Sequence, residues 1–438
     1  MTSLFRICVR AALCVAMGLW FTSLPAQAQS DGKLKIGFVY FLSGPGASFG
    51  IHARNGSELI VNALNNGTVP APYNTKGIGG FEIVPIYVDE AGGAQKQLAE
   101  YRRIVEREKV DVVIGYNSSA DCNALGPVAE EMQKITIFFY CGHSQMFEEV
   151  LTDPVYSFRT APPGTIDSIA AARYILAKYP NTDSIAGINQ NYSWGTDSWS
   201  EFKASMEALK PSVKATTAQF PKLGAGEYGA EISALLANPA DVIFSSFWGG
   251  DADAFVLQAK SRDLAKRSKL AFCMGTGIID GLGAEMVEGA IVGARGPHSY
   301  LAGDTPLARW FTSTYEKTYK QTPTFGASAA AQAILGYKAA FEKAAAKAKK
   351  APTTMEIIEA FRGLEFETPS GFPIRMAKAK GHEGIQATAY GTYSGWDKAK
   401  NKPIITDVKY FNAECVNPPA GVKAMDWIKS GFKGAKCD

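Results

Sequence analysis

The stretch VDVVIGYNSSADCNALGPVAEE, residues 110–131, joins a dense apolar run to a segment with helical spacing. The run Val110–Ile114 predicts a buried strand, and NALGPVAEEMQ predicts a helix. Between them stand Ser118 and Ser119, where hydroxyl side chains either cap a helix or help to hold an anion at its N-terminus. A strand followed directly by a helix is the repeating unit of a parallel sheet covered by helices.

The same unit recurs on both sides of this stretch. Further strands are predicted at KLKIGFVYFL, FEIVPIYVDE and ITIFFYC, with SGPGASFG as a turn and ARNGSELIVNAL and QKQLAEYRRIVERE as helices. The pattern restarts after residue 160, with strands at SIAGINQN, KATTAQF, DVIFSSF and KLAFCM. We therefore expect an α/β protein of two doubly wound parallel-sheet lobes. Lobe I is predicted to comprise residues 33–159 and 296–375, and lobe II residues 160–295 and 384–438.

Residues 1–28 are typical of a secretory signal peptide. Arg6 and Arg10 precede the apolar run AALCVAMGLWFTSL, and PAQAQS ends in a small-x-small pattern, so we expect cleavage near Ala28. The apolar run is shorter than the ~20 residues that a membrane span needs. No later segment is long and apolar enough either, so the mature protein is expected to be exported and not to span a membrane.

Charge and metal-ligand content exclude two classes of function. Loss of Arg6 and Arg10 lowers the net charge from 45 − 42 = +3 to 43 − 42 = +1. A nearly neutral chain without a basic stripe lacks the electrostatic signature of a nucleic-acid binder. Only four histidines occur and no cysteine has zinc-ligand spacing, so no metal is expected.

The cysteine count leaves the pairing partly open. Five cysteines remain in the mature chain, and export places them in an oxidising compartment. Because five is odd, at least one thiol stays free in a monomer. We expect Cys415 and Cys437 to form a disulfide that closes the C-terminal tail, and Cys122 with Cys141 is a second candidate pair.

The residues just after each predicted strand are the candidates for a binding site. In a parallel sheet, ligands bind beyond the carboxyl ends of the strands. The segments there are SGPGASFG, GYNSSAD, CGHSQM, NQNYSWG, SFWGGD and MGTGIID. They are rich in serine, glycine, asparagine and aromatic residues and poor in charge. This composition suits a small organic ligand with one polar end.

Three catalytic interpretations compete with binding. GTGIID begins like a dinucleotide loop, but Asp280 stands where the third glycine belongs. CGHSQM resembles a nucleophile elbow around Ser144, except that Met146 replaces its final glycine. Ser119 and His143 follow neighbouring strands as a nucleophile and a base would, yet no third partner is evident. We expect no enzyme; a secreted hydrolase using Ser144 or Ser119 is the alternative.

The segment KLKIGFVYFLSGPGASFGIHARNGSELIVNALN resembles the leucine/isoleucine/valine-binding protein family. KGIGGFEIVPIYVDEAGGAQKQLAEYRRIV, WGTDSWSEFKASM and VEGAIVGA match it too, and the resemblance runs from Lys33 to Tyr393. It implies the type I periplasmic binding fold, with the two lobes joined by a three-segment hinge. It also implies a monomeric periplasmic receptor that delivers a small solute to an inner-membrane ABC permease, without a cofactor. A ligand-sensing module for a membrane receptor is the alternative role.

The resemblance also assigns roles to residues. Ser119 matches the serine that holds the ligand carboxylate through its hydroxyl and amide, and Tyr116 and Ser118 belong to the same loop. Gly142 and His143 match a second loop, and Phe49 matches an aromatic gate. Trp194, together with Trp248 or Phe247, matches the aromatic walls of lobe II. Thr276 matches the place of the acid that accepts the ligand ammonium.

Departures from the family pattern bear on the ligand. Thr276 supplies no carboxylate, and an α-ammonium without a counter-ion in a desolvated cleft is costly. His143 replaces a small threonine, and the family's disulfide near the cleft of lobe I is missing, with Gly92 and Ser118 at the matching places. The expected ligand is therefore branched-chain amino-acid-like, or a carboxylate or amide without an α-amine, aromatic ligands included; Asp280 would favour an amino acid.

Overall fold

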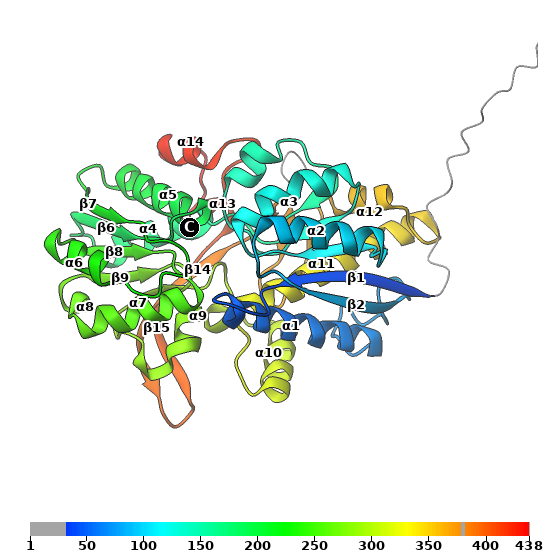
Figure 1. Cartoon of the computed structure of the whole chain (residues 1–438), viewed down its shortest axis with the longest axis horizontal. Coiled ribbons are helices and arrows are strands. Elements are labelled where there is room, and N and C mark those ends of the chain that lie inside the picture. The colour runs from blue at the N-terminus through cyan, green and yellow to red at the C-terminus, as the bar shows by residue number, and fades with distance from the viewer. Residues whose placement is uncertain (1–31, 378–381, 438) are drawn as a thin grey trace, which may run out of the picture.

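The computed structural model describes residues 32–377 and 382–437, arranged as two α/β lobes (Figure 1). The predicted signal peptide and its cleavage point lie outside the described residues. Within them, no helix is both long and apolar enough to cross a membrane.

The first lobe is built on a five-stranded parallel sheet of order β2-β1-β3-β4-β5. Its strands are β1 (Lys33–Tyr40), β2 (Glu82–Asp89), β3 (Val112–Gly115), β4 (Thr136–Phe138) and β5 (Ser157–Phe158). One face is covered by α1 (Ala47–Asn66) and α11 (Phe325–Ala348), the other by α2 (Ala94–Glu106) and α3 (Ser119–Glu131). The strands are apolar on both sides because helices cover both faces of the sheet.

The second lobe contains a seven-stranded sheet of order β15-β14-β10-β9-β8-β6-β7. Its parallel strands are β6 (Ser184–Ile188), β7 (Lys214–Gln219), β8 (Val242–Ser245), β9 (Lys269–Phe272) and β10 (Ile291–Gly293). An antiparallel hairpin of β14 (Thr388–Asp397) and β15 (Lys402–Phe411) extends the sheet at one edge. The helices are α4 (Thr165–Lys178), α5 (Ser193–Leu209), α6 (Gly229–Ala237), α7 (Gly249–Ser261), α8 (Leu264–Arg267) and α9 (Gly275–Leu282).

The chain passes between the two sheets three times, near residues 159–164, 294–305 and 386–387. After the second crossing come α10 (Pro306–Tyr319), α11, α12 (Thr354–Phe361) and a small sheet of β11 (Glu365–Phe366), β12 (Ile374–Met376) and β13 (Gly384–Ile385). The short helices are η1 (Met146–Val150), η2 (Gly283–Glu285), η3 (Ser299–Leu301), α13 (Ala413–Val416) and α14 (Ala424–Lys429). Two parallel-sheet lobes with three crossings match the expected architecture; the residue bounds assigned to each lobe stay a prediction.

The segment SGPGASFG differs from its expected form. It was predicted as a turn, but α1 begins inside it at Ala47, so Phe49 and Gly50 lie on the first turn of a helix. Gly50 allows this because a Cβ there would lie 1.9 Å from the carbonyl oxygen of Phe41. The helix can therefore start directly against the loop that leaves β1.

The structure contains two disulfides, Cys122–Cys141 and Cys415–Cys437, and Cys273 is a buried free thiol. The first links α3 to the loop after β4, and the second joins the C-terminal tail to α13. Both candidate pairings are thus present. The Cys122–Cys141 bond joins α3, just after the GYNSSAD segment, to the CGHSQM loop, both of which the sequence singled out for binding.

Candidate ligand-binding site

Loops from both lobes meet around a small cavity of about 10 Å³, room for roughly one water molecule. From the first lobe come the loops after β3 and β4; from the second come the starts of α5 and α7, the loop after β9, and the crossing that follows β10. The lining residues are Asn117, Ser119, Tyr140, Gly142, Tyr192, Trp194, Trp248, Met274 and Arg295.

The start of α3 combines a cap with an open hydroxyl. Ser118 is the N-cap, and its Oγ accepts a hydrogen bond from Asp121 N at 3.4 Å. The Ser119 side chain makes no hydrogen bond within the described residues and lines the cavity. Ser118 is thus an ordinary cap, and Ser119 has a hydroxyl to offer to a ligand.

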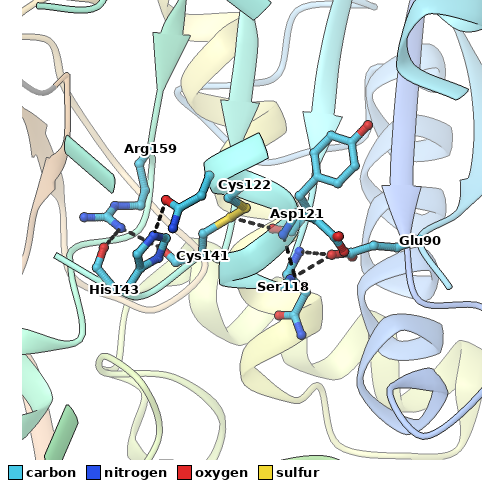
Figure 2. The surroundings of a disulfide bond; sticks show 10 residues. Glu90, Ser118, Asp121, Cys122, Cys141, His143 and Arg159 are labelled. Atoms are coloured by element: carbon cyan, nitrogen blue, oxygen red, sulfur yellow. Dashed lines mark hydrogen bonds between the residues drawn. A yellow bond between two sulfur atoms is a disulfide. The ribbon is translucent and has the colours of Figure 1, made fainter. Parts of the chain in front are cut away.

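Two backbone amides beside Ser119 already donate hydrogen bonds to a side chain of the protein, Glu90. Glu90 Oε1 accepts hydrogen bonds from Asn117 N and Ser118 N, each at 2.7 Å (Figure 2). Glu90 is fully buried, and burial raises the pKa of its carboxyl well above the ordinary value. The amides of Asn117 and Ser118 are therefore bonded to the Glu90 carboxyl, and the role of this loop as an anion cradle for a ligand stays a prediction.

The second loop of lobe I is fixed from two sides. The Cys122–Cys141 bond ties it to α3, and Arg159 Nη1 donates to the carbonyl oxygens of Cys141 and His143, both at 2.8 Å (Figure 2). His143 Nε2 lies 2.6 Å from Asn123 Oδ1, and its ring does not line the small cavity. The two loops are thereby held as one rigid unit.

His143 is a poor general base at neutral pH. Burial, together with the nearby cations of Arg159 and Arg295, lowers the pKa of His143 to about 3. Ser144 instead donates a hydrogen bond of 2.9 Å to Glu201 Oε1. Neither Ser119 nor Ser144 has a histidine partner in the described part of the chain, so the geometry gives no support to the hydrolase alternative.

Gly142 makes room for the aromatic wall of lobe II. A Cβ at Gly142 would lie 2.4 Å from Trp194 Cζ3 and 2.9 Å from Arg295 Nη2. The indole of Trp194 is anchored by its Nε1, which donates to Ser246 O at 2.9 Å. Trp248 forms another wall, and its Nε1 donates to Tyr192 OH at 2.8 Å.

The sequence reasoning missed Arg295, the one cationic side chain that lines the small cavity. Its guanidinium is 1% exposed and lies over the rings of Tyr140 and Trp194, with centroids at 5.3 and 5.4 Å. Nη1 donates to Asp167 Oδ2 at 3.2 Å, whereas Nη2 has no hydrogen-bond partner within the described residues. A buried guanidinium nitrogen without an acceptor is costly, so Nη2 is a donor available to a ligand at this cavity.

The other predicted site residues lie elsewhere. Phe49 lines an adjoining cavity between the lobes. Tyr116 and Phe247 are core residues: Tyr116 packs near Phe138, and Phe247 packs on Tyr228 and Phe255. Thr276 is fully buried, its hydroxyl has no hydrogen-bond partner among the residues that the structure describes, and it does not line the small cavity.

Comparison with known proteins gives the family. The sequence pattern of the periplasmic binding protein family matches residues 33–397. The chain belongs to this family. Its members are non-enzymatic solute-binding proteins, which confirms the predicted fold and the predicted binding function over catalysis.

Distant relatives agree with this assignment. The Leu/Ile/Val-binding protein homolog 4 of Brucella melitensis is 23% identical over 356 residues, covering 79% of this chain and 81% of that protein. An R. palustris ABC-transporter solute-binding protein in complex with benzoate is 20% identical, with a TM-score of 0.72, covering 86% of this chain and 96% of its own. A leucine-binding protein from Thermotoga maritima is 17% identical, with a TM-score of 0.70, covering 86% and 98%.

Proposed function

We propose that this protein is the extracytoplasmic solute receptor of an ABC importer, and that it captures a small carboxylate without an α-amine. After export and removal of the leader near Ala28, it works as a monomer and delivers its ligand to an inner-membrane permease. Family membership and the ABC-transporter solute-binding proteins among its structural relatives support the importer role.

The observation that carries the ligand class is the unpartnered Nη2 of Arg295, which lines the small cavity opposite the loops of lobe I. A carboxylate there would accept from Nη2 and from the hydroxyl of Ser119. A hydrogen bond to a charged group contributes roughly 1.5–3 kcal/mol, and more specificity when a planar guanidinium is the donor.

An α-ammonium fits this cavity poorly. None of its lining residues is an aspartate or a glutamate. The family resemblance matches Thr276, which carries no charge, to the position of the acid that accepts a ligand ammonium. The walls are the rings of Tyr140, Tyr192, Trp194 and Trp248, which suit a flat apolar body. Structural relatives have been solved with benzoate and 4-hydroxybenzoate, which are acids of this kind.

Binding follows from closure of the lobes. The ligand contacts residues of both lobes only when the lobes meet, so it shifts the population toward the closed state. The small cavity holds only the carboxylate end, and the remainder extends into the adjoining cavity of about 320 Å³, which shares Trp248 and Met274 with it. Together the two spaces suit a compact organic acid.

A thermal-shift panel followed by calorimetry tests this proposal. Benzoate, 4-hydroxybenzoate and hexanoate are compared with their primary amides and with leucine and isoleucine. A ligand at a hundred times its Kd adds about 2.7 kcal/mol to the free energy of unfolding. We expect acids to raise the melting temperature and amides not to do so.

Arg295→Lys is the matched variant, because lysine keeps the charge beside Asp167 but loses the planar fork. It should weaken acid binding about tenfold or more and reduce the preference of the protein for acids over their amides.

The names of the Leu/Ile/Val-binding relatives favour a second candidate, a branched-chain amino-acid receptor. A panel in which only leucine and isoleucine shift the melt would select that candidate and reject ours.

A further inference from the structure

The adjoining cavity of about 320 Å³ has a polar character of its own. It is lined from the first lobe by Phe49 and His52 of α1 and by Thr324 before α11, and from the second lobe by Asp253 of α7 and Asp280 of α9. It lies beyond Trp248 and Met274, away from Arg295. Both lobes therefore contribute hydrogen-bonding groups to a second compartment.

Two carboxylates lie together on the lobe II side. Asp280 Oδ1 accepts a hydrogen bond from Tyr300 OH at 2.8 Å, whereas Oδ2 is buried without a partner in the described structure. Asp253 makes no hydrogen bond or ion pair with any described residue. Its carboxylate packs against α9 because residue 281 is glycine: a Cβ there would lie 2.6 Å from Asp253 Oδ2.

Thr324 completes the set from the opposite lobe. It is 5% exposed, and its hydroxyl has no hydrogen-bond partner within residues 32–377 and 382–437. No lysine or arginine lines the cavity. His52 supplies no counter-charge, because burial lowers its pKa and its Nδ1 lies 2.9 Å from Tyr315 OH. The compartment thus offers two carboxylates and the Thr324 hydroxyl, with no lysine or arginine in its lining.

We propose that this compartment binds an ammonium group that the ligand carries at the end away from its carboxylate. Asp280, Asp253 and Thr324 would accept the three N–H bonds, while Arg295 holds the carboxylate on the other side of Trp248. The inference rests on the proposed carboxylate site and narrows its ligands to acids with a remote ammonium. An α-amino acid differs, because its two charges lie on neighbouring atoms.

The electrostatics of the compartment agree with this assignment. Burial and the nearby Asp253 raise the pKa of Asp280 to about 8, and burial raises the pKa of Asp253 to about 6. An entering ammonium stabilises the ionised forms, so binding near pH 7 releases a proton and tightens as the pH rises toward 8.

Other charged groups lie on the outer side of Asp280. A surface pocket there is lined by Glu316, Lys320, Lys400 and Lys402. Lys402 Nζ lies 2.9 Å from Glu316 Oε1, which pairs these two charges with each other. None of the three lysines lines the inner cavity, and none forms an ion pair with Asp280 in the described part of the chain.

Calorimetry with isosteric probes tests the inference. 5-Aminopentanoate is compared with hexanoate, and 4-(aminomethyl)benzoate with 4-ethylbenzoate, so that a methyl group replaces the ammonium. We expect the wild-type protein to prefer each ammonium probe by about tenfold or more. Asp280→Asn should remove most of that preference while hexanoate affinity stays within about twofold. Asp304→Asn, an exposed change outside both cavities, is the control and should leave every affinity unchanged.

Three outcomes separate the two proposals. If acids bind but ammonium and methyl probes bind equally, the remote-ammonium inference fails and the carboxylate site stands. If the ammonium preference persists in both Asp280→Asn and Asp253→Asn, the assignment of the compartment is wrong. If no acid binds at all while leucine does, the proposed carboxylate function fails first. Release of a proton, measured in buffers of different ionisation enthalpy, would support the role of Asp280.

Discussion

Replacement of Gly142 by alanine should weaken ligand binding while leaving each lobe folded. The added methyl would lie 2.4 Å from Trp194 Cζ3 and 2.9 Å from Arg295 Nη2. The indole is held by Nε1, which donates to Ser246 O, and a Cβ built on the neighbouring Gly164 would also lie 2.4 Å from Cζ3. Something must therefore move, and overpacking of this kind typically costs about 1–3 kcal/mol.

This cost falls on the closed state. Gly142 follows β4 of the first lobe and Trp194 lies on α5 of the second, so the contact joins the two lobes, and we expect the added methyl to oppose their closure. At about 1.4 kcal/mol per factor of ten, affinity should drop between about 5-fold and about 150-fold. The melting temperature without ligand should change little, because lobe cores far from the contact are untouched.

Isothermal titration calorimetry with the acid selected by the panel measures the loss, and a thermal melt without ligand measures the fold. Gly250→Ala is the matched control: it lies two residues after Trp248 in α7, and its Cβ would meet no atom within 4 Å. Gly142→Ala with wild-type affinity would refute the steric argument. A large drop in the ligand-free melting temperature would show that the contact supports the fold rather than closure.

Three further outcomes are expected. Ser119→Ala should weaken acid binding by about 1.5–3 kcal/mol, the contribution of a hydrogen bond to a charged group, measured by calorimetry, with an unchanged melt. The double change of Cys415 and Cys437 to serine should lower the unfolding free energy of the C-terminal segment by about 3 kcal/mol, because it opens a loop of sequence separation 22; urea unfolding followed by Trp427 fluorescence measures it. Burial raises the pKa of Glu201 from 4.5 to about 8, so its contribution to stability is full below pH 4.5 and is lost as the pH rises through 8; Glu201→Gln should flatten that part of a melting curve taken from pH 5 to 9.

Local pattern predicted the scaffold and part of the site. The strand-then-helix unit at residues 110–131 fixed where Ser119 would lie, because residues beyond the carboxyl ends of parallel strands converge. The same rule placed Gly142, Trp194 and Trp248 at the cavity. It could not choose between Phe247 and Trp248, which are adjacent; Trp248 lines the cavity and Phe247 packs into the core.

The buried charged residues of the site could not be predicted from local sequence, because their partners lie far away along the chain. Arg295 and Asp167 are 128 residues apart, and Glu90 reaches amides 27 and 28 residues further along the chain. No periodicity links such positions. The position of Arg295 gave one usable signal: it follows β10 as the other site residues follow their strands, and the same rule would have included it.

The environment of Arg295 couples recognition of charge to closure of the lobes. The guanidinium lies over Tyr140, which follows β4 of lobe I, and over Trp194 of lobe II. With the lobes together, the guanidinium is withdrawn from water: Nη1 donates to Asp167, but Nη2 has no acceptor in the described structure. Closure without a ligand therefore leaves a buried donor unsatisfied. A carboxylate removes that penalty, whereas an amide or an apolar solute of the same shape removes less of it. On the proposed function, discrimination would therefore arise from the differential stability of the closed state, because a solute without the charge would leave Nη2 of Arg295 unsatisfied when the lobes close.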